Sequence, residues 1–306
     1  IAAGSERTTF DTEGADEHAL GLRLVDDAER IAARLDKLAT RKRPASIVIV
    51  GGGVSGVEAV GEILRRRGHG DEYKIHVVER ESRILEQQPE ALAVDAVRRF
   101  TPYPVTLHTD ASIRQVDARS VTLDNGEKLA ADLCIWSAGT ALPAFLRDAG
   151  LSEAGDEWLP VDDTLRSLYA ENVFVAGDCA DLQVPLRKQA YHAMAMGEVA
   201  GDNIGRLLEN RSLREFRPAP MPMLISCGDI TTWLLMGELA VASPVLAAAK
   251  EGVYQATMAR LASPRDPLRY SADVLGRATM ATRRLLLPQL TPGKIIAGLT
   301  GSRLVL

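Results

Sequence analysis

The chain has 306 residues, a length typical of about two domains, and 46% of its residues are hydrophobic, which is ordinary for a globular protein. Its formal net charge of −5 at pH 7 argues against a nucleic-acid surface as its main function, and no apolar run is long enough to span a bilayer. The three cysteines, at positions 134, 179 and 227, lie far apart, so neither a local zinc site nor a redox dithiol is predicted.

The N-terminal region carries few signals. Ile1 to Ser5 include no basic segment of the kind that opens a signal peptide, and the first residue is not Met. The chain is therefore expected to be a piece of a longer protein. A helix is predicted between Leu24 and Leu38, where apolar residues recur at helical spacing. The Arg-Lys-Arg-Pro run at 41–44 then breaks the pattern and predicts a domain boundary.

The most informative motif occupies residues 45–59. An apolar, β-branched run from Ile47 to Val50 predicts a strand, and a helical stretch follows from Val57 to Arg67. Between them stands a G-x-G-x-x-G sequence, which is weak alone but in this setting is typical of a dinucleotide-binding turn. Free N–H groups and the positive dipole end of the helix N-terminus favour an anion there.

Each glycine of this turn has its own expected role. Gly51 permits the tight turn, Gly53 lets the backbone approach the phosphates, and Gly56 lets the helix pack closely against the strand. Val54 lies between the second and third glycines and is expected to line the same site. We therefore predict that these four residues bind a dinucleotide.

Glu79 is the candidate residue for choosing between the two nicotinamide cofactors. It is the last residue of a second predicted strand, which begins at Lys74. Glu79 lies 28 positions after Gly51. A carboxylate there accepts hydrogen bonds from the ribose hydroxyls of an adenosine and repels a 2′-phosphate, so it favours NADH over NADPH. The neighbouring Arg80 leaves phosphate binding open, because a guanidinium receives phosphate well. A merely solvated strand end is the alternative for Glu79.

Glu58 is predicted to fall in the first turn of the glycine-loop helix. One interpretation is a carboxylate that is favourable to the helix dipole. The other is a catalytic residue that faces the reacting end of the cofactor. Position in the sequence does not separate the two.

The middle of the chain changes from helical to alternating patterns. A helix is predicted at 89–100, and Asn125-Gly126 marks a hairpin turn. The strands predicted in this region are 105–107, 111–116, 120–123, 128–129 and 133–137, the last followed by Ala138-Gly139. Cys134 lies within the last of these strands, and we expect it to pack in the core.

A second strong signal lies at 173–180. A buried strand, 172–176, is predicted to deliver Gly177 and Asp178 at its carboxyl end, where open α/β sheets bind ligands. The Asp178 carboxylate can accept hydrogen bonds from sugar-alcohol hydroxyls. The remaining predicted elements are a helix at 189–208, a hairpin of strands at 223–227 and 231–236, and tail helices at about 244–262 and 271–287.

The two glycine motifs together resemble those of the pyridine nucleotide-disulfide oxidoreductase flavoproteins, and the resemblance covers nearly the whole chain. It implies an α/β fold in which a Rossmann-like NAD(H)-binding domain is inserted in an FAD-binding domain, here incomplete, with a C-terminal α+β segment. The expected parts are the end of the first FAD segment and a linker (1–43), the NAD(H) domain (44–138), the second FAD segment (139–219) and a C-terminal hairpin with a helical, basic tail (220–306).

The resemblance also implies roles for single residues. Ile1 to Ser5 is similar to the strand end that leaves the first flavin segment. Glu58 would sit near the nicotinamide. The implied cofactor contacts are Gly51, Gly53, Gly56 and Glu79 with NADH, Ala138 and Gly139 at the crossing beneath the nicotinamide, and Gly177 and Asp178 with the flavin ribityl and pyrophosphate groups.

Within this family, residues 135–139 and 173–180 are most similar to type II NADH dehydrogenases. This similarity implies an FAD-dependent NADH oxidoreductase in which a hydride passes from NADH to flavin and electrons then pass to a quinone-like acceptor. Two departures bear on that expectation. The family's opening flavin G-x-G-x-x-G is absent, and the A-Q-x-x-x-Q pattern near the quinone, here starting at Ala190, has Tyr191 and Ala195 in place of its glutamines.

The C-terminal tail is basic, because residues 245–306 contain nine Lys or Arg and three Asp or Glu, a net charge of +6. Lys250 to Tyr254 resembles the region that type II enzymes lay against the membrane, and Arg277, Arg283 and Arg284 flank three leucines. We expect a cytoplasmic protein with peripheral contact at the inner face of the membrane. The alternative is a homodimer or domain-packing helix with a solvated basic face.

Two other functions remain open. An NADH-dependent reductase of a ferredoxin- or rubredoxin-type carrier protein shares both dinucleotide motifs and needs no glutamine pair. A non-catalytic, NADH-binding regulatory fragment needs no flavin. His192, in the helix at 189–208, is either a proton relay near the flavin or a packed helix residue.

Overall fold

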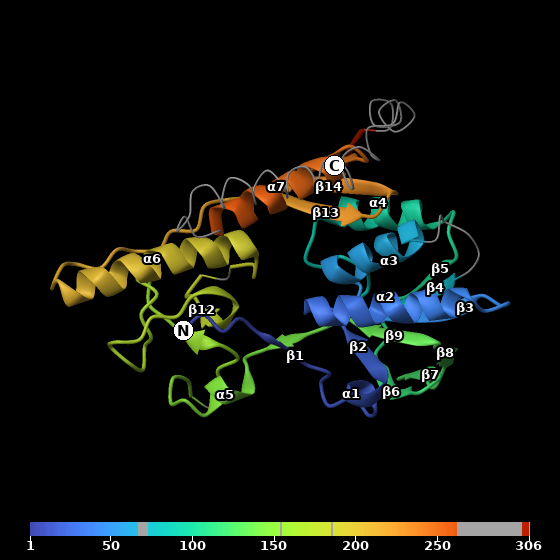
Figure 1. Ribbon diagram of the computed structural model, residues 1–306, viewed down its shortest axis with the longest axis horizontal. Helices are drawn as coiled ribbons and strands as arrows, with labels where there is room; N and C mark the ends of the chain where they lie inside the picture. The colour runs from blue at the N-terminus through green and yellow to red at the C-terminus, as the bar shows by residue number, and fades with distance from the viewer. Residues whose placement is uncertain (67–72, 154, 185, 262–301, 306) are drawn as a thin grey trace, which may run out of the picture. The chain divides into compact units, whose positions relative to one another are not determined.

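The computed structural model describes residues 1–66, 73–153, 155–184, 186–261 and 302–305. The chain forms two compact units, and each is assembled from two separate stretches of sequence (Figure 1). The first unit comprises Ile1–Phe10 and Gly139–Pro220, and the second comprises Asp11–Ala138 and Met221–Leu306.

The second unit is built on a five-stranded parallel sheet. Its strands, in spatial order, are β2 (Ala19–Gly21), β9 (Leu133–Trp136), β3 (Ala45–Val50), β4 (Tyr73–Val78) and β5 (Val105–His108). The strands predicted at 47–50, 74–79, 105–107 and 133–137 are confirmed within a residue or two at each end. Because both faces of a parallel sheet are covered, its central strands are near-continuous apolar runs.

Different layers cover the two faces of this sheet (Figure 1). Along β3, Ile47 and Ile49 enter a core shared with helices, whereas Val48 and Val50 enter a core shared with short strands. The helices are α2 (Val25–Ala39), α3 (Val54–Arg66) and α4 (Glu90–Phe100). The short strands are β6 (Ile113–Asp117), β7 (Ser120–Leu123) and β8 (Lys128–Ala130), an antiparallel meander joined by α1 (Ala15–His18).

The C-terminal part of the second unit is an antiparallel sheet with one long helix. Its strands are β13 (Met223–Cys227), β14 (Thr231–Met236), β15 (Leu239–Ser243) and β16 (Arg303–Val305), and its helix is α7 (Leu246–Leu261). The predicted hairpin at 223–236 is confirmed, while β15 and β16 were not predicted. β13 packs on α3, so this C-terminal sheet covers the glycine-loop helix.

The first unit has little regular structure beyond one long helix. Its elements are β1 (Glu6–Arg7) paired with β10 (Thr140–Ala141), β11 (Leu159–Pro160) paired with β12 (Ala180–Asp181), α5 (Ala144–Arg147), the 3₁₀ turn η1 (Gly177–Cys179) and α6 (Ala190–Leu208). A separate core gathers around Phe174, Val175 and Met196. The helix predicted at 189–208 is confirmed.

The strand predicted at 172–176 is wrong, because its backbone groups bond to several partners instead of one ladder. The Ile1 ammonium donates to Phe174 O, Ala176 N–H donates to Ile1 O, and Val175 N–H donates to Leu165 O. Among the described residues, a single bridge, Arg166 to Phe174, is the only ladder-like pairing of this segment. The apolar pattern of these residues reflects their burial in the core and not a strand.

The division into units also differs from the expected one at residues 11–43. β2 extends the parallel sheet beside β9, and α2 buries Ile31, Leu35 and Leu38 in the core of the second unit. These side chains tie the stretch to the dinucleotide-loop unit, not to the first flavin segment. The tail helix predicted at 271–287 lies outside the described residues.

Candidate functional site

The glycine turn after β3 is tight on its inner side and open on its outer side. Gly51 has φ +98°, and a Cβ there would lie 3.0 Å from Ala138 N. A Cβ on Gly56 would lie 1.9 Å from Gly51 O, so the helix reaches the strand only without a side chain. No atom of the described residues lies within 4 Å of a Cβ built on Gly53. The turn therefore leaves backbone accessible where a pyrophosphate needs it.

The carboxyl end of β9 supports this turn. Ser137 Oγ donates to Val50 O at 2.9 Å and to Gly51 O at 3.1 Å, and Ala138 follows directly. α3 begins at Val54, so the N–H groups of its first turn point toward the space above Gly53. Ser137 was not identified from the sequence, because a serine at a strand end has no distinctive pattern.

Glu79 lies against the glycine turn. Its Oε2 accepts the Gly52 N–H at 2.7 Å and its Oε1 accepts the Glu81 N–H at 2.9 Å. Arg80 points elsewhere, with its guanidinium 3.0 Å from Glu81 Oε1 and its side chain 73% exposed. The structure thus brings Gly51, Gly53, Val54, Gly56, Glu79 and Ala138 together at the carboxyl edge of the sheet.

Glu58 connects α3 to the C-terminal part of the same unit. Because α3 begins at Val54, Glu58 lies in its second turn, so the first-turn prediction is wrong. Its carboxylate accepts the Ser226 N–H at 2.9 Å and a hydrogen bond from Lys250 Nζ. Glu58 also lines a cavity of about 760 Å³ together with Asp229. The carboxylate is therefore fixed in place beside a large cavity.

The second predicted site lies in the first unit. Gly177 has φ +80°, and Asp178 Oδ2 accepts a hydrogen bond from Ser5 Oγ at 3.0 Å. Lys188 Nζ donates to the Asp178 carbonyl and lies 3.4 Å from the centre of the Trp158 ring. The chain passes between the units at Ala138-Gly139, so Gly139 belongs to this unit.

A family model described as pyridine nucleotide-disulphide oxidoreductase matches residues 1–197. The chain belongs to this family. The predicted family resemblance is therefore confirmed, and so is the α/β fold class.

Curated relatives of this chain are longer than the chain itself. A probable NADH dehydrogenase of Dictyostelium discoideum is 29% identical over 204 residues, which cover 60% of this chain and 45% of the relative. A type II NADH:quinone oxidoreductase of Haemophilus influenzae is 26% identical over 269 residues, covering 76% of this chain and 60% of that protein. The chain thus spans about half to three fifths of the length of these two relatives.

A solved structure shares the fold of this family member. The structure of NDH2 from Plasmodium falciparum in complex with NADH matches with a TM-score of 0.71 at 15% sequence identity. The match covers 93% of this chain and 77% of that chain. At this identity the likeness establishes the fold alone.

The three cysteines are buried, which confirms the predicted core role of Cys134. Burial, reinforced by Glu58, raises the pKa of Cys227 to about 12, so this thiol stays protonated at neutral pH. No group of three or more metal-ligating side chains occurs within the residues that the structure describes.

α6 carries the last predicted site residues. It begins at Ala190, and the His192 ring packs against Tyr191 with ring centres 4.5 Å apart. His192 is buried, and burial lowers its pKa, so its ring is neutral at pH 7. His192, Gly177 and Asp178 line one small cavity of about 20 Å³. The helix thus brings a neutral histidine close to the Gly177-Asp178 turn.

Over the described part of the chain, no helix is long and apolar enough to cross a membrane. Lys250 to Tyr254 lie within α7, where Val253 and Tyr254 are more than half exposed. Arg277, Arg283 and Arg284 lie outside the described residues.

Proposed function

We propose that this chain is part of an FAD-dependent NADH oxidoreductase that passes electrons from NADH through flavin to a quinone-like acceptor. The observation that carries the proposal is the glycine turn, which is tight below, open above Gly53, and flanked by the Glu79 carboxylate. That combination suits an adenosine dinucleotide without a 2′-phosphate. Family membership and the names of the relatives support the same activity.

The residues of the second unit would bind and orient NADH. The N–H groups at the start of α3 would face the pyrophosphate, and Glu79 would accept the adenosine ribose hydroxyls. Its present acceptance of the Gly52 N–H keeps the carboxylate where those hydroxyls would arrive. Because Arg80 is paired with Glu81, it offers a 2′-phosphate only a solvated and partly neutralised charge.

The residues of the first unit would hold part of FAD. Asp178 offers a carboxylate to ribityl hydroxyls, and Lys188 adds a cation beside it, so the side chains present fit that part of the group. Flavin, when bound, supplies the hydride-accepting chemistry, and the protein supplies orientation and electrostatics. Gly139 and Ala190 would line the same cofactor.

Glu58 is the candidate catalytic residue near the nicotinamide. Its carboxylate is fixed by Ser226 and Lys250 and reaches the cavity shared with Asp229. The ion pair with Lys250 would hold the Glu58 side chain in place while it lines the space for a reacting group. Lys250, a residue of the predicted membrane-facing region, is therefore the partner that this role requires.

A peripheral membrane location at the cytoplasmic side is a further part of the proposal. It rests on the +6 charge of residues 245–306 and the exposed Val253 and Tyr254. Sedimentation of the full chain with anionic liposomes at low salt tests it. A chain that stays in the supernatant with anionic and neutral liposomes alike would contradict membrane contact.

One experiment separates the proposed function from its rivals. The full chain is mixed with FAD, freed of unbound flavin, and examined by absorbance before and after NADH, then with menadione or a ferredoxin as acceptor. Flavin bands that NADH bleaches, with rapid menadione reduction, are expected. Reduction of ferredoxin but not menadione would favour the carrier-protein reductase. NADH binding with no flavin bands would favour a non-catalytic fragment.

A further inference from the structure

A strongly basic cavity lies in the second unit, apart from every site residue described so far. It has a volume of about 600 Å³, and five cations and one carboxylate line it: Arg34, Arg41, Lys42, Arg43, Arg119 and Asp132. The cations come from α2, the loop between α2 and β3, and the turn between β6 and β7. We refer to this space as the arginine cavity.

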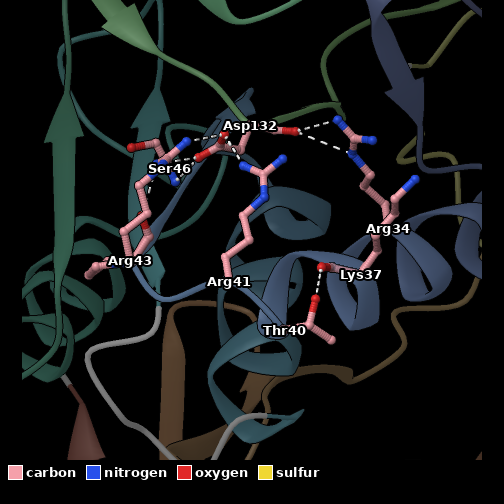
Figure 2. A network of polar contacts seen from close by, with 8 residues as sticks. Arg34, Lys37, Thr40, Arg41, Arg43, Ser46 and Asp132 are labelled. Carbon is pink, nitrogen blue, oxygen red and sulfur yellow. Dashed lines mark hydrogen bonds and ion pairs between the residues drawn. The ribbon is translucent and has the colours of Figure 1, made fainter.

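Asp132 accepts hydrogen bonds from three of the arginines of the arginine cavity, as Figure 2 shows. Its Oδ1 accepts from Arg41 Nη1 at 2.5 Å and from Arg43 Nη2 at 2.8 Å, and its carbonyl oxygen accepts from Arg34 Nη2 at 3.1 Å. Its Oδ2 accepts the Ser46 N–H at 3.0 Å. Burial opposes its ionisation, but hydrogen bonds from Arg43, Ser46 and Arg41 prevail and lower the pKa of Asp132 below 3.8.

One carboxylate does not balance the cations of the arginine cavity. Five positive charges face one negative charge, an excess of four. The Arg34 side chain bonds only to a main-chain carbonyl, and within the described residues the side chains of Lys42 and Arg119 make no hydrogen bond or ion pair. Like charges that are gathered around one space repel one another unless an anion enters it. The cavity therefore has the charge of an anion site without its counter-charge.

The side chains indicate which anion fits. Guanidinium groups match the oxygen geometry of phosphate, and a lysine adds a mobile point charge. The volume falls within the range of roughly 300–1,000 Å³ that small-ligand sites occupy. Ala118 is the only apolar residue in the lining, and every other lining residue carries a charge that a phosphate group can meet. We propose that the arginine cavity binds a ligand with clustered phosphate groups, either a free polyphosphate or a phosphorylated lipid headgroup.

This site would be distinct from the dinucleotide site. The arginine cavity lies at the amino-terminal edge of the parallel sheet, where β3 begins at Ala45 and where Asp132 directly precedes β9. The glycine turn lies at the opposite end of β3, beyond Val50. A strand of that length spans roughly 16–20 Å. The phosphate ligand and NADH should therefore bind at the same time.

The decisive variant removes charge without disturbing Asp132. Lys42→Gln/Arg119→Gln takes away two cavity cations that have no partner in the described part of the chain. The matched control, Arg30→Gln/Arg114→Gln, removes the same charge from exposed positions outside the cavity lining. Both full-chain variants are titrated at low salt with inorganic tripolyphosphate, with saturating NADH present, and separately with phosphatidylcholine vesicles that contain phosphatidic acid.

The expected result is a loss of affinity of about tenfold or more in the cavity variant and less than about twofold in the control. Such a selective loss with tripolyphosphate identifies a free polyphosphate, and a selective loss with vesicles alone identifies a lipid headgroup. The proposal is overturned if neither probe binds the wild-type chain, if both variants weaken equally, or if NADH displaces the probe.

Chemical labelling gives a second test that needs no variant. Bound tripolyphosphate or bound vesicles should slow the acetylation of Lys42 several-fold, while exposed Lys74 on β4 should react at an unchanged rate. Equal rates at Lys42 with and without either probe would also overturn the proposal. Peptide mass spectrometry measures both rates in one sample.

Discussion

Gly61 of α3 and Gly228 of the turn between β13 and β14 contact each other through their backbones alone. A Cβ on Gly61 would lie 2.2 Å from the carbonyl carbon of Cys227, and a Cβ on Gly228 would lie 2.1 Å from Gly61 O. This contact fixes the C-terminal sheet on the same helix that begins at the dinucleotide turn. It requires that neither position carries a side chain.

Replacement of Gly61 by alanine should therefore destabilise the second unit. The methyl group has no flexible neighbour to displace, because the nearest atoms all belong to the backbone of Cys227 and Gly228. We expect Gly61→Ala to lower the free energy of unfolding by about 1–3 kcal/mol, the usual cost of overpacking. Urea denaturation followed by circular dichroism measures this difference.

Gly201→Ala is the matched control for that prediction. Gly201 lies in the interior of α6, and a Cβ built there has no neighbour within 4 Å in the described part of the chain. Alanine should raise stability by about 0.5–1 kcal/mol through helix propensity. If Gly61→Ala also raised stability, the close backbone contact would be contradicted.

The buried carboxylate of Asp95 should make the free energy of unfolding depend on pH in the acid range. Trp233 Nε1 donates to Asp95 Oδ2 at 2.8 Å, and Arg99 Nε donates to the same oxygen at 2.6 Å. Burial opposes ionisation, but the bonds from Arg99, Trp233 and Arg98 prevail and lower the pKa of Asp95 from 3.8. Its stabilising contribution is therefore complete above pH 3.8 and is lost as the pH falls through the lowered value.

Asp95→Asn should accordingly cost about 1–3 kcal/mol of unfolding free energy at neutral pH, as for hydrogen bonds to a charged group. The cost should shrink as the pH falls below 3.8. Asp110→Asn is the control, since Asp110 is exposed and its φ of +51° suits either residue. A cost for Asp95→Asn that stays constant from neutral pH into acid would show that its charge contributes nothing.

The elements that were predicted well are those whose signal is local. Ile47 to Val50 form a strand because β-branched residues fill both faces of a parallel sheet, and the glycines that follow permit the turn. The hairpin of β13 and β14 was predictable in the same way, because Gly228 permits the turn between two apolar strands. The segment at 172–176 has equally apolar residues, but its backbone partners lie far away in the chain at Ile1 and Leu165.

Site residues were harder to find where a distant partner gives them their role. Glu58 was named from the motif, but its position in the second turn and its pairing with Lys250 depend on how α7 packs. By its sequence the Arg-Lys-Arg-Pro run at 41–44 predicts only a domain boundary. Its role depends on Asp132, some ninety positions later, whose carboxylate accepts hydrogen bonds from Arg41 and Arg43.

Glu58→Gln should lower the turnover of NADH oxidation by about tenfold or more while leaving the KM for NADH little changed. Glutamine keeps an acceptor for the Ser226 N–H but leaves the Lys250 ammonium without its counter-charge beside the cavity. Stopped-flow absorbance of the FAD-loaded chain measures the rate. Glu62→Gln is the control, because Glu62 lines the same cavity but pairs with exposed Arg65. Equal turnover rates in the two variants would show that Glu58 has no catalytic role.

Glu79→Gln should weaken NADH binding by roughly tenfold and narrow the preference for NADH over NADPH. The amide keeps one acceptor oxygen for the Gly52 N–H, so the turn should persist, but it loses the charge that binds ribose hydroxyls and repels a 2′-phosphate. Fluorescence titration with each reduced cofactor gives the two dissociation constants. Glu127→Gln, which removes the same charge from an exposed turn residue, should change neither constant. If Glu79→Gln left the ratio of the two constants unchanged, cofactor choice would reside elsewhere than in this carboxylate.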